Sequence, residues 1–191
     1  NYSTKVSIDK TISQNKYGHM IIERKFFFQL PEELKYRVLL FVLSNNQSKK
    51  KQIKSDSILK LIDILKSSNF KKHTLNKNLF INKKSNVLVV KEIGRLNSKE
   101  AIMEKKFVWK DIYKININAP LTSDLKIGFA DESFDKKSHC DEDKILVNSM
   151  PAIWRKNKII SVPFLDKRKK SIASCVPIKI SEYNDYKMLS N

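Results

Sequence analysis

The chain has 191 residues, with 38 lysines and arginines against 20 aspartates and glutamates, so its formal net charge is +18. A hydrophobic content of 41% suffices for at least one core, and the length fits two small domains. The sequence contains no run of about 18 apolar residues and no apolar signal-peptide segment, so we expect a cytoplasmic protein without a membrane partner.

The excess of positive charge favours binding to a polyanion, and RNA, DNA and an anionic membrane surface all fit. Compositional drift is a competing explanation, because the chain is rich in Lys, Asn and Ile and poor in Gly, Ala and Arg. Such drift exchanges Arg for Lys without changing the charge, but it does not remove acids. We therefore expect a nucleic-acid partner.

The first 95 residues predict a short leading segment and a small helical domain. Residues 1–25 are polar with scattered apolar side chains, typical of a linker or the tail of a preceding helix, and Met20–Phe28 fits the start or extension of a helix. Pro31 followed by two glutamates predicts a helix start. A second helix is expected after the cap Ser55-Asp56-Ser57. Residues spaced for burial on these two helices are Leu34, Val38, Leu39, Val42, Ile58, Leu61, Ile62 and Leu65.

A β-hairpin closes this domain, which we place at residues 26–95. Its strands are Thr74–Ile81 and Val87–Glu92, with Lys83-Lys84-Ser85-Asn86 as the turn. Residues 96–191 are strand-rich, and alternating burial is expected along Ile112–Ile117. The predicted fold class is α+β, with a small helical and hairpin domain followed by a mostly antiparallel β-rich domain. Further strands are expected at Phe107–Ile117, Leu125–Ala130, Ile159–Val162 and Ile172–Ile180.

Motifs in the first domain resemble tRNA(Ile)-lysidine synthetase. Leu30–Leu40 is similar to the family's Leu-Pro-x-Glu-x-x-x-Arg-x-Leu helix, and His73–Arg95 to its Thr-Leu-Gly-Gly … Arg-Glu-x-Gly-Arg hairpin. The hairpin glycines are replaced by Asn76, Lys77 and Asn78, and the leading Arg by Lys91. Asn tolerates a left-handed turn, so we expect the turn to survive.

Two later motifs follow in the family's order. Phe107-Val108-Trp109 stands where the family has a Trp-Asp-Gly-Arg-Phe strand, and Met150–Arg155 before Val162-Pro163 resembles Leu-Pro-Ala-Leu-Trp … Val-Pro. After Trp109 the chain departs from the family, continuing Lys110-Asp111-Ile112-Tyr113. The Pro151-x-x-Trp154-Arg155 order predicts a tight turn carrying an aromatic anchor and a guanidinium.

The resemblance implies the C-terminal, tRNA-recognising part of an ATP-dependent ligase active in tRNA processing. That enzyme adenylates the wobble cytidine of tRNA(Ile), with ATP and magnesium, and free lysine then displaces AMP to give lysidine. The family's ATP loop, Ser-Gly-Gly-x-Asp-Ser, is expected in a separate N-terminal catalytic domain, because Gly18, Gly94 and Gly128 are never paired here. The chain also begins with Asn1, which suggests a fragment, inactive alone. Its expected partners are tRNA(Ile), that catalytic domain and, in a homodimer, a second copy.

Catalytic and metal sites are not expected. His19, His73 and His139 lack an evident nucleophile or acid partner, and the acidic loop Asp131–Lys144 with His139 and Cys140 has no second ligand pair at zinc spacing. Cys140 and Cys175 are expected to remain thiols in a reducing cytoplasm.

The expected RNA contacts are phosphate contacts from the basic stretches. Between Ser44 and Lys84 the sequence has many lysines and only two acids, Asp56 and Asp63. This imbalance favours a surface that binds successive phosphates, and it is less typical of a face that is only solvated. Trp154 is expected to be a packing anchor, with stacking on an RNA base as the alternative. The candidate RNA-binding residues are Arg37, Lys50, Lys51, Lys54, Lys71, Lys72, Arg155, Arg168 and Lys169.

Two alternatives remain open from the sequence. A general basic RNA- or DNA-binding module would have the same charge, and a structural or dimerisation domain would have its lysines through compositional drift alone.

Overall fold

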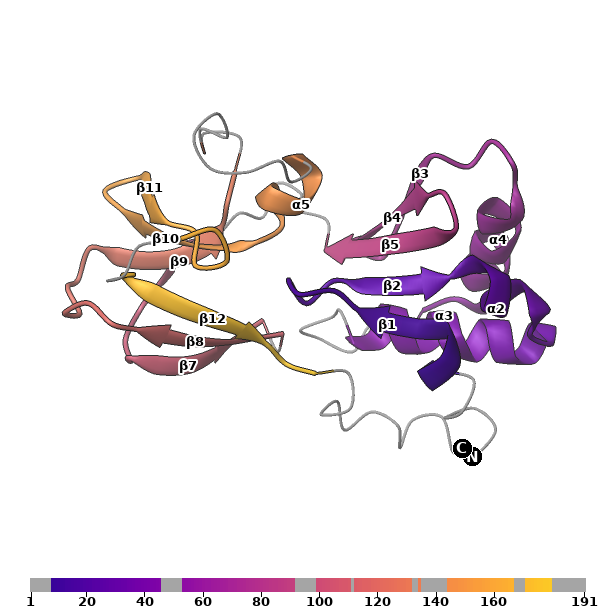
Figure 1. The fold of residues 1–191 in the computed structure, drawn as a ribbon, viewed down its shortest axis with the longest axis horizontal. Coiled ribbons are helices and arrows are strands. Elements are labelled where there is room, and N and C mark those ends of the chain that lie inside the picture. Colours follow the sequence, from indigo (N-terminus) through magenta and orange to yellow (C-terminus); the bar gives the residue numbers. More distant parts are fainter. Residues whose placement is uncertain are drawn as a thin grey trace. The chain divides into compact units, whose positions relative to one another are not determined.

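The computed structural model describes residues 8–45, 53–91, 99–110, 112–131, 134, 144–166 and 171–179. The fold is α+β, as predicted, and the strand pairs among the described residues are antiparallel (Figure 1). Contacts divide the chain into unit 1, which comprises residues 1–92 and 178–191, and unit 2, which comprises residues 93–177. The predicted boundary after residue 95 falls within residues 92–98, which lie outside the described part.

Unit 1 combines a sheet of strand order β1-β2-β5-β4-β3 with helices packed on one of its faces (Figure 1). Its elements are β1 (Ile12–Gln14), β2 (Met20–Glu23), α2 (Arg24–Gln29), α3 (Glu32–Asn45), α4 (Ser55–Lys66), β3 (Lys72–Leu75), β4 (Asn78–Lys83) and β5 (Asn86–Lys91). Alternate residues of the inner strands share a core with apolar side chains of the helices. This core includes Met20, Ile22, Phe80, Val87 and Val89 from the strands and Leu39, Val42, Leu61 and Leu65 from the helices.

Residues 8–25 are part of unit 1 and not a linker, while residues 1–7 of the predicted leading segment lie outside the described residues. Residues 8–11 are helical, and β1 and β2 form a hairpin that pairs with β5. Ile12, Met20 and Ile22 are buried in the core, and Gly18 adopts a positive φ of 86° in the connecting turn. The helix expected over Met20–Phe28 is therefore a strand to Glu23 and a helix only from Arg24.

The two predicted helices are confirmed, and one predicted cap is wrong. α3 begins at Glu32 after Pro31, with Glu32 and Glu33 in its first turn. α4 buries Ile58, Leu61, Ile62 and Leu65, as predicted. Its N-cap position is Lys54, which makes no side-chain capping bond. Ser55 lies inside the helix instead, where its hydroxyl is 3.2 Å from the hydroxyl of Tyr36 on α3.

The predicted hairpin exists as β4 and β5, but its first strand, predicted over Thr74–Ile81, is divided by a turn into β3 and β4, so the chain forms a three-stranded meander β3-β4-β5. Asn76 and Lys77 form its first turn with φ of 51° and 61°, so the turn does survive without the family's glycines. The second turn is narrower than predicted, since β4 ends at Lys83 and β5 begins at Asn86. Lys84 at this turn also has a positive φ, of 54°.

Unit 2 contains two small sheets, with strand orders β11-β10-β9-β6 and β12-β8-β7 (Figure 1). The elements are β6 (Glu100–Ala101), β7 (Lys106–Trp109), β8 (Tyr113–Ile117), β9 (Leu125–Phe129), α5 (Lys144–Asn148), β10 (Pro151–Arg155), β11 (Lys158–Ser161) and β12 (Ala173–Pro177). The single strand expected over Phe107–Ile117 is wrong, because a turn that includes Lys110, with φ of 55°, divides it into the hairpin of β7 and β8. The expected alternation holds along β8, where Tyr113, Ile115 and Ile117 are buried and Lys114 is exposed, but Ile112, expected on the face of Lys114, is buried. The two sheets share an aromatic core in which the Trp109 and Phe129 rings lie 4.7 Å apart.

The tight turn predicted at Pro151–Arg155 is wrong. These residues form β10, and the turn follows at Lys156 and Asn157, which have φ of 44° and 63°. Proline is tolerated here because it is the first residue of the strand. Pro151 to Trp154 are buried in succession, which is typical of a strand covered on both faces.

The last described residues return from unit 2 to unit 1. Ile178, predicted within a long last strand, belongs to unit 1, where its carbonyl accepts a bond of 3.0 Å from the Gln14 side-chain amide. Among the helices of the described ranges, none combines the length and apolar composition that crossing a membrane requires.

Candidate nucleic-acid interface

The predicted RNA-binding residues that the structure describes in unit 1 fall at two ends of α4. Lys54 is exposed at its N-terminal end, near Arg37, because the Tyr36–Ser55 contact joins the two helices there. Lys71 and Lys72 are exposed beyond its C-terminal end, at the start of β3. A helix of this length spans about 18 Å, so the predicted residues do not form a single site.

Lys71 and Lys72 lie at the end of the sheet where β4 turns into β5. The Asn82 amide donates to the Lys71 carbonyl at 2.9 Å, and the Arg24 amide donates to the carbonyl of Ser85 in the turn at 3.1 Å. These two bonds bring three separate parts of the chain to one end of the sheet. We call the basic residues gathered there the sheet-end cations: Arg24, Lys25, Lys71, Lys72, Lys83 and Lys84.

The sheet-end cations have little acidic opposition. Neighbouring strands lie about 4.8 Å apart, so the edge from β3 to β2 measures about 14 Å. Glu23 is the acid at this edge, in register with Asn86, and neither it nor Lys25, Lys71, Lys72 or Lys84 forms an ion pair with a described residue. The positive charge of these four lysines is therefore available to an external anion.

Arg24 is held differently from the lysines around it. Its guanidinium lies 5.4 Å from the centre of the Phe28 ring, a cation–π contact that restricts its orientation. The buried Nη1 atom has no hydrogen-bond partner among the described residues. A buried donor without a partner is costly.

Two predicted arginines are already paired. Arg37 donates from Nη2 and Nε to the same Glu33 oxygen, at 2.7 and 3.2 Å, one helical turn away. Arg155 lies 3.5 Å from Asp124 in a partly exposed pair. A hydrogen bond from Thr122, and then the charge of Arg155, lower the pKa of Asp124 below its ordinary value. Exposed pairs of this kind contribute little to stability, so a phosphate can displace either acid.

Trp154 is a packing anchor, as the sequence indicated. The side chain is 1% exposed, and the Lys99 ammonium lies 3.7 Å from its ring centre. Its indole nitrogen has no hydrogen-bond partner among the described residues. With its ring covered in this way, Trp154 has no exposed face for stacking on a base.

Four candidates, Lys50, Lys51, Arg168 and Lys169, lie outside the described residues, as do His139 and Cys140 of the acidic loop. Sequence reasoning missed Arg24, Lys25, Lys83 and Lys84 as site residues, although it placed Lys83 and Lys84 in the hairpin turn. A helix over Met20–Phe28 leaves no strand end at Glu23. In the structure β2 ends there, which places Arg24 and Lys25 beside the β4–β5 turn. The usable signal was Gly18 between two short apolar stretches, which is typical of a hairpin.

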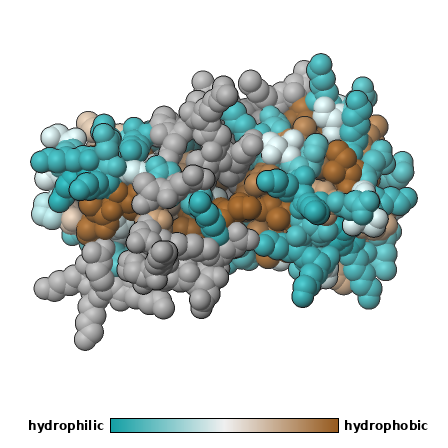
Figure 2. Space-filling model, turned by 90° about the horizontal axis from the view of Figure 1, so that it is seen from above, coloured by the Kyte–Doolittle hydropathy of each residue, from teal (hydrophilic) through white to brown (hydrophobic). Residues whose placement is uncertain are grey.

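The charge is unevenly divided along the sequence. Residues 1–92 carry 19 lysines and arginines against 7 acids, whereas residues 93–191 carry 19 against 13. In Figure 2 the visible face carries many hydrophilic side chains (teal) among the residues that are not grey. Unit 1 is therefore the stronger candidate for binding a polyanion.

Metal and acid–base chemistry have little support among the described residues. There, no three His, Cys, Asp or Glu side chains are grouped as a metal site would require. His19 is buried, and burial lowers its pKa to about 4, so the imidazole is neutral near pH 7. Cys175 is a half-buried free thiol on β12, and burial raises its pKa.

The comparisons with known proteins give no relative: no protein-family model matches this chain, and no curated protein matches it.

Proposed function

We propose that this chain binds RNA through the sheet-end cations of unit 1, as the tRNA-recognising part of a tRNA(Ile)-lysidine synthetase. The observation that carries RNA binding is the gathering of Arg24, Lys25, Lys71, Lys72, Lys83 and Lys84 at one sheet end with little acidic opposition. Lysine and arginine at this density attract phosphates through counterion release.

The four sequence motifs, which follow the family's order, support tRNA(Ile) as the RNA that is bound. The elements that carry them have the expected type in three cases: a helix at Leu30–Leu40, a hairpin around Asn76-Lys77 and a strand at Phe107–Trp109. The fourth motif, at Met150–Arg155, is a buried strand rather than a turn. This order of elements is the reason for proposing tRNA(Ile) rather than RNA in general.

The chemistry of this proposal belongs to a separate catalytic domain. There ATP, with magnesium, would adenylate C2 of the wobble cytidine, and lysine would displace AMP to complete lysidine. This chain would hold the tRNA so that the anticodon reaches that active site. Its lysines act as point charges that fix register without reading sequence, whereas Arg24, with its planar guanidinium held over Phe28, can grip one phosphate with defined geometry.

A competition experiment tests this proposal. Labelled tRNA(Ile) transcript is bound to the full chain at moderate salt and then displaced with unlabelled tRNA(Ile) or with duplex DNA. The proposal predicts that tRNA(Ile) displaces the label at a concentration at least tenfold below that of DNA, a gap of about 1.4 kcal/mol. Equal displacement would favour a general basic module. No tRNA binding, together with a mass that rises with concentration in light scattering, would favour a structural or dimerisation domain.

A triple variant tests the surface. Lys71→Gln, Lys72→Gln and Lys84→Gln together should weaken tRNA binding by about tenfold or more, since each removes a phosphate contact. The matched control is Lys10→Gln, Lys60→Gln and Lys77→Gln, which removes the same charge from exposed positions elsewhere in unit 1. Equal effects of the two triples would show that net charge, and not this surface, determines binding.

A further inference from the structure

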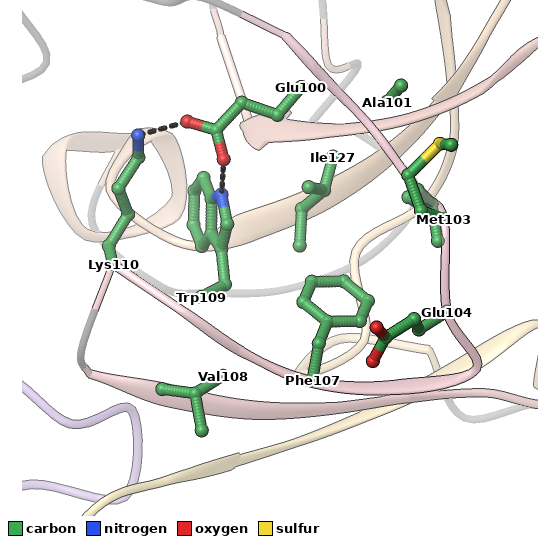
Figure 3. A pocket seen from close by; sticks show the side chains of 10 residues that line it. Glu100, Ala101, Met103, Glu104, Phe107, Val108, Trp109, Lys110 and Ile127 are labelled. Atoms are coloured by element: carbon green, nitrogen blue, oxygen red, sulfur yellow. Dashed lines mark hydrogen bonds and ion pairs between the residues drawn. The ribbon is translucent and has the colours of Figure 1, made fainter.

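A pocket of about 270 Å³ opens beside the four-stranded sheet of unit 2 (Figure 3). Its lining comes from β6, from the segment that follows β6, from β7 and from Ile127 on β9. The aromatic Phe107 and the flexible Met103 supply apolar surface, and Met103 is 82% exposed. An exposed methionine beside a half-buried aromatic ring offers apolar contact surface for a ligand.

The acidic groups of the pocket are of two kinds. Glu100 is fixed, because its carboxylate accepts a bond of 3.0 Å from the Trp109 indole and forms an ion pair with Lys110 (Figure 3). Glu104 is exposed on the lining and makes no hydrogen bond or ion pair within the described part of the chain. Its carboxylate lies near the Phe107 ring in Figure 3, so an unoccupied acceptor and an aromatic ring face the same space.

The charge of this lining differs from that of the rest of the protein. The lining contains two carboxylates, those of Glu100 and Glu104, and one cation, Lys110, whereas the whole chain has a net charge of +18. A phosphate would meet repulsion from Glu104 here. A flat ring that carries N–H donors at its edge would instead meet apolar contacts on its face and a carboxylate at its edge.

We propose that this pocket binds one unstacked nucleobase with an exocyclic amino group, the base packing against Phe107 and donating to Glu104. The inference rests on the proposed RNA binding and adds base recognition to phosphate contact. An RNA held by unit 1 presents unpaired bases in its loops and at its 3′ end, and such bases are free to enter a pocket. Cytosine and adenine carry the required amino group on their pairing edge, whereas uracil carries an oxygen there.

A lone ammonium group is the less favoured occupant. Lys110 already supplies a cation to Glu100, and the remaining lining from Phe107, Met103 and Ile127 is apolar. Such a lining contributes contact area to a flat ring and little to a hydrated cation.

Nucleoside titrations read by NMR test the pocket separately from RNA binding. The indole N–H of Trp109, which reports on Glu100, is assigned in the ¹⁵N-labelled full chain with the variants Trp109→Phe and Trp154→Phe. Cytidine, adenosine and uridine are then added singly. Cytidine and adenosine should shift this signal with at least about tenfold higher affinity than uridine, a discrimination typical of one hydrogen bond to a charged acceptor.

Variants of exposed residues complete the test. Glu104→Ala, which removes the acceptor, should reduce cytidine and adenosine binding to the level of uridine, and Phe107→Leu should weaken all three. The control Lys106→Gln, next to Phe107 on β7 but outside the pocket lining, should change none. No shift, equal affinity for the three nucleosides, or a larger shift with free lysine would each overturn the inference. None of these results depends on the sheet-end cations, so tRNA binding with an unresponsive Trp109 leaves the proposed function standing.

Discussion

Units 1 and 2 contain basic side chains in similar number but arrange them differently. In unit 1 backbone bonds gather the sheet-end cations from three parts of the chain, and Lys25, Lys71, Lys72 and Lys84 among them form no ion pair with a described residue. In unit 2 Arg155 and Lys110 are paired, with Asp124 and Glu100, whereas the exposed Lys105, Lys106 and Lys126 form no ion pair with a described residue. A net charge of +18 therefore does not identify a binding surface, because the position and the pairing of each cation decide where positive charges can act together.

The two units also differ in how they bury polar groups. Unit 1 buries His19 as a neutral imidazole, and unit 2 buries two indole rings, of which only that of Trp109 has a hydrogen-bond acceptor among the described residues. Because none of these groups is a sheet-end cation, substitutions at each should change stability while leaving those six charges in place.

The largest expected effect is on the core of unit 2. Trp154→Ala should lower the free energy of unfolding by about 3–5 kcal/mol, because the side chain is 1% exposed and its removal leaves a large cavity. Chemical denaturation followed by circular dichroism measures this loss. A cost below about 1 kcal/mol would contradict the assignment of Trp154 as a packing anchor.

The next effect is a pH dependence that arises in unit 1. The pKa of His19 is lowered from 6.5 to about 4 on folding, so the unfolded chain binds this proton more readily. Stability should therefore be highest above pH 6.5 and fall by roughly 3 kcal/mol as the pH is lowered to 4. Denaturation at several pH values measures the decline, and His19→Gln should flatten it. An unchanged decline in that variant would assign it to other groups.

A smaller effect should distinguish the two tryptophans of unit 2. Trp109→Phe removes the bond to Glu100 and should cost about 1–2 kcal/mol more than Trp154→Phe, which removes an indole nitrogen without a described partner. Both variants replace a buried tryptophan with phenylalanine. Equal costs by denaturation would show that the Trp109–Glu100 bond contributes little.

The smallest effect concerns an arginine of unit 1. Glu33→Gln removes the ion pair with Arg37 and should lower stability by about 0.3–0.5 kcal/mol, the usual contribution of such a helical pair. If Arg37 contacts phosphate, tRNA affinity should rise about twofold at low salt. The control Glu32→Gln removes the same charge from the neighbouring position. Equal gains in the two variants would assign the effect to net charge.

The sequence predicted the elements that local patterns specify. Pro31 and two glutamates mark the start of α3, the spacing of Ile58, Leu61, Ile62 and Leu65 marks the buried face of α4, and alternation marks β8. The leading hairpin was missed because β1 and β2 have only three and four residues, too few to show a period. Without that hairpin, Arg24 and Lys25 could not be placed beside Lys83 and Lys84.

The sequence also could not show which cations form ion pairs, and the reason is a different one. The pairing of Arg155 with Asp124 joins positions 31 residues apart and depends on the register of β10 against β9. The Glu33–Arg37 pair, in contrast, was readable from its spacing of four residues on one helix. Periodicity does not reveal the register between strands that are far apart in sequence. The sequence therefore could not show that Arg155, a predicted phosphate contact, is already paired.

The salt dependence of tRNA binding tests the central claim most directly. The full chain is compared with Lys71→Gln/Lys72→Gln/Lys84→Gln in unit 1 and with Lys105→Gln/Lys106→Gln/Lys126→Gln in unit 2, which loses the same charge. The slope of log affinity against log salt should become shallower by about 2–3 in the unit 1 variant and by less than about 1 in the unit 2 variant. Equal changes in slope in the two variants would contradict the account.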